Sequence, residues 1–175
     1  MATYLIRPGR STEKDKSRED YCLKNGVTSI GWALAGDLIN VKSYQEIKEM
    51  ISAVFKGTEK EKAIPSFSSQ LWIFVGKIKE GDYIVMPLIA QAGHAAIGTV
   101  TGSYKYQPDD EINRHVMSVD WEKVVNRSVF GDDIVRGPLS SRKTICSFQK
   151  VDEADFRIKK IIEDGKDPIF WCNNR

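Results

Sequence analysis

The chain has 175 residues, of which 41% are apolar and 29% charged, and its formal net charge is +2. This length suits a single well-buried domain of ordinary globular composition. It contains no apolar run long enough to span a bilayer and no leading segment that resembles a signal peptide, so we expect no membrane partner. Cys22, Cys146 and Cys172 are widely separated and form no CxxC pair, which favours a reducing, cytoplasmic setting over disulfides or a zinc site.

The first half of the chain predicts one strand and two helices. Residues 3–7 are short, apolar and β-prone and end at Pro8-Gly9, whereas the charged residues 10–20 predict a solvated loop that leads into a short helix near residues 22–24. Ser43 and Glu46 form a capping box for a helix over residues 43–55, which Gly57 ends. The apolar residues of 66–79 recur with helical spacing, so we expect a second helix there, capped by Ser66.

The second half is mainly strands. We expect them over residues 83–88, 95–104, 114–121 and 144–148, followed by an amphipathic helix over 152–164. Asp132-Asp133 after Gly131 predicts a turn, and Trp121 a core position on its strand. This order indicates an α+β fold, with a curved sheet or small β-barrel flanked by helices. We expect one domain over residues 1–168, with 169–175 a tail that starts a linker to a missing effector domain.

A tryptophan between two glycines is the most informative local feature. Trp32 lies between Gly31 and Gly36, in a segment that does not read as a helix or a long strand. Glycine allows close backbone approach and positive φ, so a ring in such a turn can offer one face to a flat ligand. The alternative is that Trp32 is a structural plug.

The search for catalytic groups yields little. The chain has no Gly-x-x-x-x-Gly-Lys-Ser/Thr phosphate loop, and its two histidines, His94 and His115, have no further ligands at metal spacing. Glu46-Ile47-Lys48 has the spacing of a nuclease motif but lies on a predicted helix, where the two side chains do not share a strand face. We therefore expect a binding domain that is not an enzyme and uses no cofactor or metal.

The binding features are stronger. Aromatic residues occur in or beside turns, and basic residues gather near the first strand, along residues 114–127 and in residues 136–143. Stacking on aromatic rings combined with basic groups for phosphate is how proteins hold an unstacked base. The basic residues are Arg7, Arg10, Arg114, Lys123, Arg127, Arg136, Arg142 and Lys143.

A series of short motifs carries a family resemblance. Residues 4–11 (Tyr-Leu-Ile-Arg-Pro-Gly-Arg-Ser) are followed by Ile-Gly-Trp at 30–32 and Gly-Asp-Leu at 36–38, and Ser-Ser-Arg-Lys-Thr stands at 140–144. Between them lie Gln70-Leu-Trp-x-Phe74, Ile78-Lys-x-Gly-Asp82, Ile97-Gly-x-Val-Thr-Gly-x-Tyr104-x-Tyr106, Arg114-His115 and Val119-x-Trp121. In this order they resemble the PUA-like superfamily and, within it, the EVE and YTH domains that read modified bases. The central run is similar to EVE-like domains attached to Mrr-type restriction nucleases.

The resemblance implies an aromatic cage for a flipped base, with Trp32 as its first wall. YTH domains carry a second tryptophan in a loop before the Val-x-Trp strand, but residues 107–113 contain none here, so Tyr104, Tyr106 or Trp72 must form the facing wall. Arginine in the Ser-Arg-x-Thr turn would contact phosphate. The implied base pocket comprises Trp32, Arg7, Pro8, Gly9, Ser29, Gly31, Trp72, Tyr104, Tyr106 and Asp37. The implied phosphate contacts are Arg10, Arg114, His115, Arg136, Arg142 and Lys143.

The function implied is that of a modified-DNA reader in the specificity domain of a modification-dependent restriction system for phage defence, with a fused or associated nuclease. It would flip 5-methylcytosine, another modified cytosine or a methylated adenine into the pocket, at an unstacking cost of a few kcal/mol. One alternative is a PUA-like module that binds RNA. Another is a nucleotide sensor that regulates a fused effector.

Overall fold

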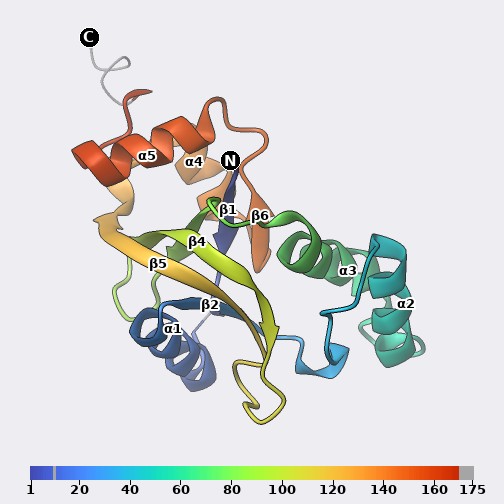
Figure 1. Ribbon diagram of the computed structural model, residues 1–175. Coiled ribbons are helices and arrows are strands. Elements are labelled where there is room, and N and C mark those ends of the chain that lie inside the picture. Colours follow the sequence, from blue (N-terminus) through green and yellow to red (C-terminus); the bar gives the residue numbers. More distant parts are fainter. Residues whose placement is uncertain (10, 170–175) are drawn as a thin grey trace.

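The computed structural model describes residues 1–9 and 11–169 and centres on a six-stranded mixed sheet (Figure 1). The strand order is β2-β5-β4-β3-β1-β6; β1 and β3 are parallel and the other neighbours antiparallel. The α+β class is confirmed, and the sheet is open rather than a closed barrel, because β2 and β6 form its two edges. The strands are β1 (Thr3–Ile6), β2 (Val27–Ile30), β3 (Tyr83–Pro87), β4 (His94–Tyr106), β5 (His115–Asn126) and β6 (Ile145–Ser147).

Helices cover the sheet in two groups, and Figure 1 shows α4 and α5 at the end of the molecule opposite α1. Alternation along β1 sends Ile6 to the core with α2 and α3, and Leu5 to the core with α5. Among the described residues no helix is long and apolar enough to cross a membrane. The helices are α1 (Glu13–Asn25), α2 (Tyr44–Phe55), α3 (Ile64–Trp72), α4 (Asp132–Arg136) and α5 (Ala154–Asp164).

The loop predicted over residues 10–20 is wrong, because α1 begins at Glu13. Thr12 caps it by accepting from the Asp15 backbone N–H, and the Asp15 carboxylate accepts in return from the Thr12 N–H. The helix is nearly all polar, and only Glu19 and Cys22 are buried. A helix with so few apolar positions has no stripe from which its period can be read.

The helices predicted from capping and periodicity are present. The Ser43 hydroxyl accepts from the Glu46 N–H at 3.3 Å, as expected for α2. The helix predicted over 66–79 is also present, but it begins at Ile64 with Pro65 in its first turn, so Ser66 is not its cap. It continues as a π-helical turn over Ile73–Lys77.

Besides most of α1, the elements β2 and α4 were not predicted from the sequence. Asp132 and Asp133 lie in the first turn of α4 rather than in an isolated turn. The Arg157 guanidinium, which is fully buried, donates to the carboxylates of Asp133 at 2.7 Å and Asp167 at 2.6 Å. This triad joins α4, α5 and the segment after α5. Trp121 is also structural: its indole Nε1–H donates to the carbonyls of residues 22 and 27.

Candidate nucleic-acid interface

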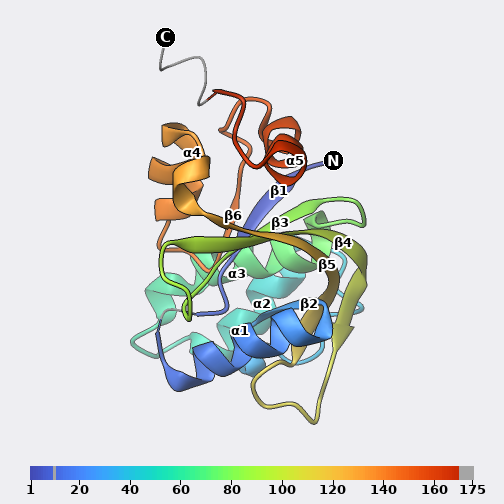
Figure 2. The same ribbon diagram turned by 90° about the vertical axis from the view of Figure 1, so that its left-hand side faces the viewer.

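Three arginines from separate segments line one cavity of about 600 Å³ near the end of β1. Arg7 follows β1, Arg127 follows β5, and Arg142 lies in the turn before β6. Figure 2 shows the turn before β6, the β3–β4 connection and the β1–α1 connection on the same side of the molecule. The lining residues that the structure describes include no Asp or Glu, so the cavity favours an anion. They are Arg7, Gly9, Ser11, Pro87, Leu88, Ile89, Ala92, Arg127, Leu139, Ser140, Ser141 and Arg142.

Backbone contacts hold this arginine cavity in shape. Arg7 and Arg127 both donate to the Leu139 carbonyl, at 2.8 and 3.2 Å, which gathers two guanidinium groups on one turn. The Glu19 carboxylate, on a residue only 3% exposed, accepts from the backbone N–H groups of Ile89 and Ala90. It thereby fixes the β3–β4 connection that forms one wall of the cavity.

The β1–α1 connection joins the arginine cavity to the end of β2. Gly9 leaves no room for a side chain, since a Cβ there would lie 1.9 Å from the Asp15 carboxylate oxygen. Arg18 donates to the Pro8 carbonyl and, at 3.1 Å from Nη2, to the Ile112 carbonyl, and burial lowers its pKa. Its Nη2 is also the nearest atom to the Gly31 side-chain position, at 3.9 Å. Arg18 was not predicted as a site residue, because its segment of the sequence predicts a loop.

Trp32 follows β2 in a left-handed conformation, with φ +61° and ψ +39°. This conformation is unusual for a residue with a Cβ and is maintained only by surrounding contacts. The ring is half-buried and packs edge-on against Phe67 of α3, with centroids 5.8 Å apart. The Trp32 carbonyl accepts from the Ala35 N–H at 2.8 Å and from His115 Nε2 at 3.2 Å.

The structure divides the candidate pocket residues into two groups. Tyr106 is half-buried, and its ring lies 5.5 Å from that of His115, whose Nε2 contacts the Trp32 carbonyl. Ser29 is buried, whereas Tyr104, although only 8% exposed, lines a separate cavity of about 580 Å³, and burial raises the pKa of Tyr104 to about 12.

Two further pocket candidates, Trp72 and Asp37, do not line the arginine cavity. The Trp72 ring packs on Gly76, where a Cβ would approach it to 2.5 Å. Asp37 is exposed, and its carboxylate accepts from the Ile39 N–H in the same turn.

The structure places only some of the predicted phosphate contacts at the arginine cavity. Arg142 lines the arginine cavity, but His115 has no exposed surface and cannot contact a phosphate. Arg136 is exposed and forms an ion pair with Asp132, Lys143 lines a different cavity, and the half-buried Arg114 does not line the arginine cavity. Arg10 lies outside the described residues. The sequence placed Arg127 only within a basic segment, and its position in the cavity depends on the length of β5.

Comparison with known proteins assigns a family without a described function. A family model described as "Domain of unknown function (DUF8426)" matches residues 4–149. The chain belongs to this DUF8426 family. No curated protein matches it. Among the parts described in the structure, this DUF8426 chain has no group of three or more His, Cys, Asp or Glu that would hold a metal.

Solved YTH domains are similar to this chain at low sequence identity. The YTH domain of Zygosaccharomyces rouxii MRB1 protein, in complex with N6-methyladenosine RNA, is 14% identical, with a TM-score of 0.43 over 93% of the DUF8426 chain and 84% of the YTH chain. The YTH domain-containing protein mmi1, in a structure with RNA, is 11% identical, with a TM-score of 0.40 over 94% and 88% of the two chains. A second mmi1 YTH complex with RNA is 10% identical, with a TM-score of 0.42 over 95% and 84%.

Proposed function

We propose that this chain is a non-enzymatic domain that binds nucleic acid and reads a modified base. The observation that carries the proposal is the arginine cavity, which collects Arg7, Arg127 and Arg142 without a carboxylate among its described lining residues. Guanidinium groups bind phosphate through charge-assisted, often bidentate hydrogen bonds. A volume of about 600 Å³ also exceeds the space that a single phosphate needs, so sugar and base atoms fit beside it.

The base site in this proposal is the turn at Trp32, with Tyr106 as the second aromatic residue. The β1–α1 connection leads to it, because Arg7 and Gly9 line the cavity while Arg18 donates to the Pro8 carbonyl and lies beside Gly31. Stacking on an aromatic ring contributes about 1–3 kcal/mol per base, which offsets much of the cost of unstacking. A methyl group adds only about 0.8 kcal/mol on burial, so recognition of a modification also requires the pocket to fit unmodified bases poorly.

RNA and DNA share the phosphate that the arginines would contact, and the ribose 2′-hydroxyl distinguishes them. The finer proposal is a DNA reader in a modification-dependent restriction system, as the sequence motifs suggest. The alternative is a module that binds RNA, and the YTH structures described above hold RNA. One assay therefore covers both.

Competition fluorescence anisotropy on the whole chain tests the proposal. The competitors are matched DNA and RNA oligonucleotides that carry 5-methylcytosine, hydroxymethylated or glucosylated cytosine, N6-methyladenine or no modification. We expect one modified oligonucleotide to bind about tenfold more tightly than its unmodified match, which corresponds to about 1.4 kcal/mol. Equal affinities across the panel would contradict the proposal. Binding of a free nucleoside without oligonucleotide affinity would favour the sensor reading instead.

A further inference from the structure

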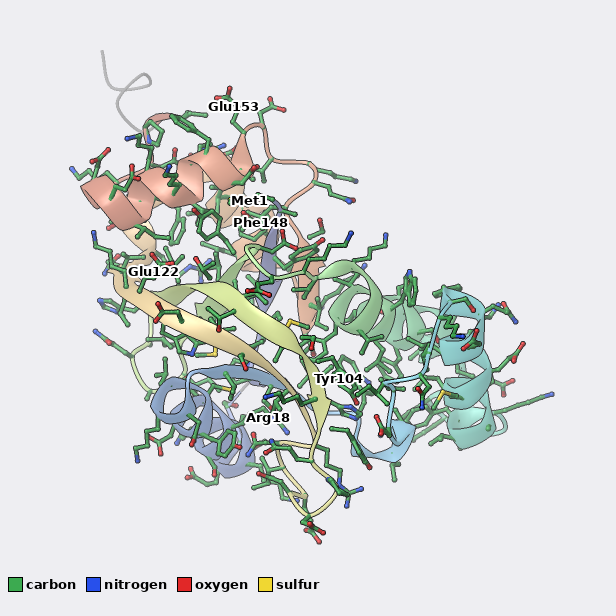
Figure 3. All side chains as sticks on the ribbon, viewed as in Figure 1. Met1, Arg18, Tyr104, Glu122, Phe148 and Glu153 are labelled. Carbon is green, nitrogen blue, oxygen red and sulfur yellow. The ribbon has the colours of Figure 1, made fainter. Side chains whose placement is uncertain are left out.

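Both ends of the turn that carries Trp32 are tied to the sheet by two buried side chains. The Tyr104 hydroxyl of β4 accepts from the Leu38 N–H at 3.2 Å and lies 2.9 Å from His115 Nδ1 of β5. At the other end of the turn, His115 Nε2 lies 3.2 Å from the Trp32 carbonyl. Figure 3 labels Tyr104 at the end of the sheet from which this turn leaves. Strand register explains the arrangement, since His115 pairs with both Ile30, just before the turn, and Tyr106.

We call the series of hydrogen bonds from the Leu38 N–H through Tyr104 and His115 to the Trp32 carbonyl the relay. The groups at its two ends determine which atom donates each hydrogen bond. The Leu38 N–H can only donate, so the Tyr104 oxygen accepts there and gives its own proton to His115 Nδ1. The Trp32 carbonyl can only accept, so His115 carries its proton on Nε2. The relay is therefore complete only with a neutral imidazole. A protonated Nδ1 would compete with the tyrosine hydroxyl as a second donor, and no acceptor for that hydroxyl would remain within the relay.

The surroundings of His115 also favour the neutral form. The residue is 0% exposed, and the rings of Tyr104 and Tyr106 lie 5.9 and 5.5 Å from the imidazole. The hydrogen bond to the Trp32 carbonyl and the charge of Asp37 favour the imidazolium, whereas Arg114, just before β5, disfavours it. Burial is the largest influence and lowers the pKa of His115 from its ordinary value of 6.5.

We propose that Tyr104 and His115 are positioning residues for Trp32, and that neutral His115 favours base binding because it links the two hydrogen bonds to the turn into one network. Their hydrogen bonds to the turn hold Trp32 in its left-handed conformation, which the surrounding structure must maintain because a side chain makes it unfavourable. This inference rests on the proposed function, because it treats Trp32 as the residue that stacks on the base. The link from Tyr104 to His115 is complete above about pH 6.5 and is lost as the pH falls through the lowered pKa of His115, whereas the hydrogen bond from Nε2 to the Trp32 carbonyl persists.

The test begins without any ligand, so that it is independent of the proposed function. The indole NMR signal of Trp32, assigned with Trp32→Phe, is followed in the whole chain from about pH 7.5 to about pH 5, the range in which a histidine titrates. We expect it to move together with the imidazole signals of His115. His94→Gln, which changes the only other histidine, is the matched control and should leave this movement unchanged.

Two variants separate positioning from mere stability. His115→Gln keeps an N–H for the Trp32 carbonyl but cannot titrate. In this variant, neither the Trp32 indole signal nor the affinity for the preferred oligonucleotide should change with pH in the way that follows a histidine pKa. Tyr104→Phe removes only the hydroxyl and should shift the Trp32 signal and weaken binding about tenfold at neutral pH. Circular dichroism checks that each variant is folded.

The outcomes distinguish the two proposals. The positioning role would be overturned if the Trp32 signal did not change as His115 titrates and was also unchanged in folded Tyr104→Phe. If the signal follows His115 but no oligonucleotide binds, the relay is supported and the proposed function fails.

Discussion

Replacing Asp167 by asparagine should lower the free energy of unfolding by about 3–5 kcal/mol, the usual cost of removing one partner of a buried ion pair. Asp167 is fully buried, and its carboxylate accepts from Arg157 Nη2 at 2.6 Å and from the Gly131 N–H at 2.9 Å. Asparagine preserves the shape but removes the charge, which leaves the buried guanidinium with the half-exposed Asp133 as its only carboxylate partner in the triad. Urea denaturation followed by circular dichroism measures the loss.

The matched control is Asp132→Asn. Asp132 forms an ion pair with Arg136 at 3.3 Å, but both side chains are more than 80% exposed, so we expect a change below about 1 kcal/mol. Equal stability of the two variants would show that the triad does not hold α4 and α5 together.

The triad also makes stability depend on pH. Hydrogen bonds from Arg157 hold the pKa of Asp133 below its ordinary value. The contribution of Asp133 is therefore complete above the pKa it has in the unfolded chain, and it is lost as the pH falls through its lower pKa in the folded state.

Replacing Arg142 by alanine should weaken binding to modified and unmodified oligonucleotides by the same factor. Arg142 lines the arginine cavity, where it would contact phosphate, and phosphate carries no information about the base. Each lost phosphate contact reduces the dependence of log K on log salt by about 0.7–0.9. The measurement is anisotropy titration at several salt concentrations.

Arg136→Ala is the control for Arg142, because it removes the same charge from an exposed residue that does not line the cavity. An equal loss in both variants would mean that net charge, rather than the cavity, supplies the affinity.

Elements with a strong local pattern could be predicted from the sequence. Ser43 with Glu46 set the start of α2, and short apolar runs between turns marked β3 and the first part of β4. Two of the elements that were not predicted, α1 and β2, depend on contacts that the local sequence does not reveal. The stability of α1 comes from the Thr12 capping box and from Glu19, which bonds to a loop 70 residues away. β2 is only four residues long and is defined by its pairing with β5.

The candidate site was predictable only where local sequence determines it. Arg142 and Gly9 lie in short turns whose composition pointed to a site, and both line the arginine cavity. Burial could not be inferred in the same way. Tyr104 and His115 resemble binding residues in the sequence, but they are buried because strand pairing with a bulge between Val100 and Tyr104 directs them into the core.

The most direct test of the account compares the native chain with Trp32→Ala. The measured quantity is the ratio of the two dissociation constants, for an unmodified oligonucleotide and for its preferred modified match. Loss of the stacking ring should remove about 1–3 kcal/mol, a factor of about 5 to 150, from binding of the modified base and bring this ratio close to one, while Arg142→Ala leaves it unchanged. A folded Trp32→Ala variant that keeps the native ratio would contradict the account and leave Trp32 as a structural plug.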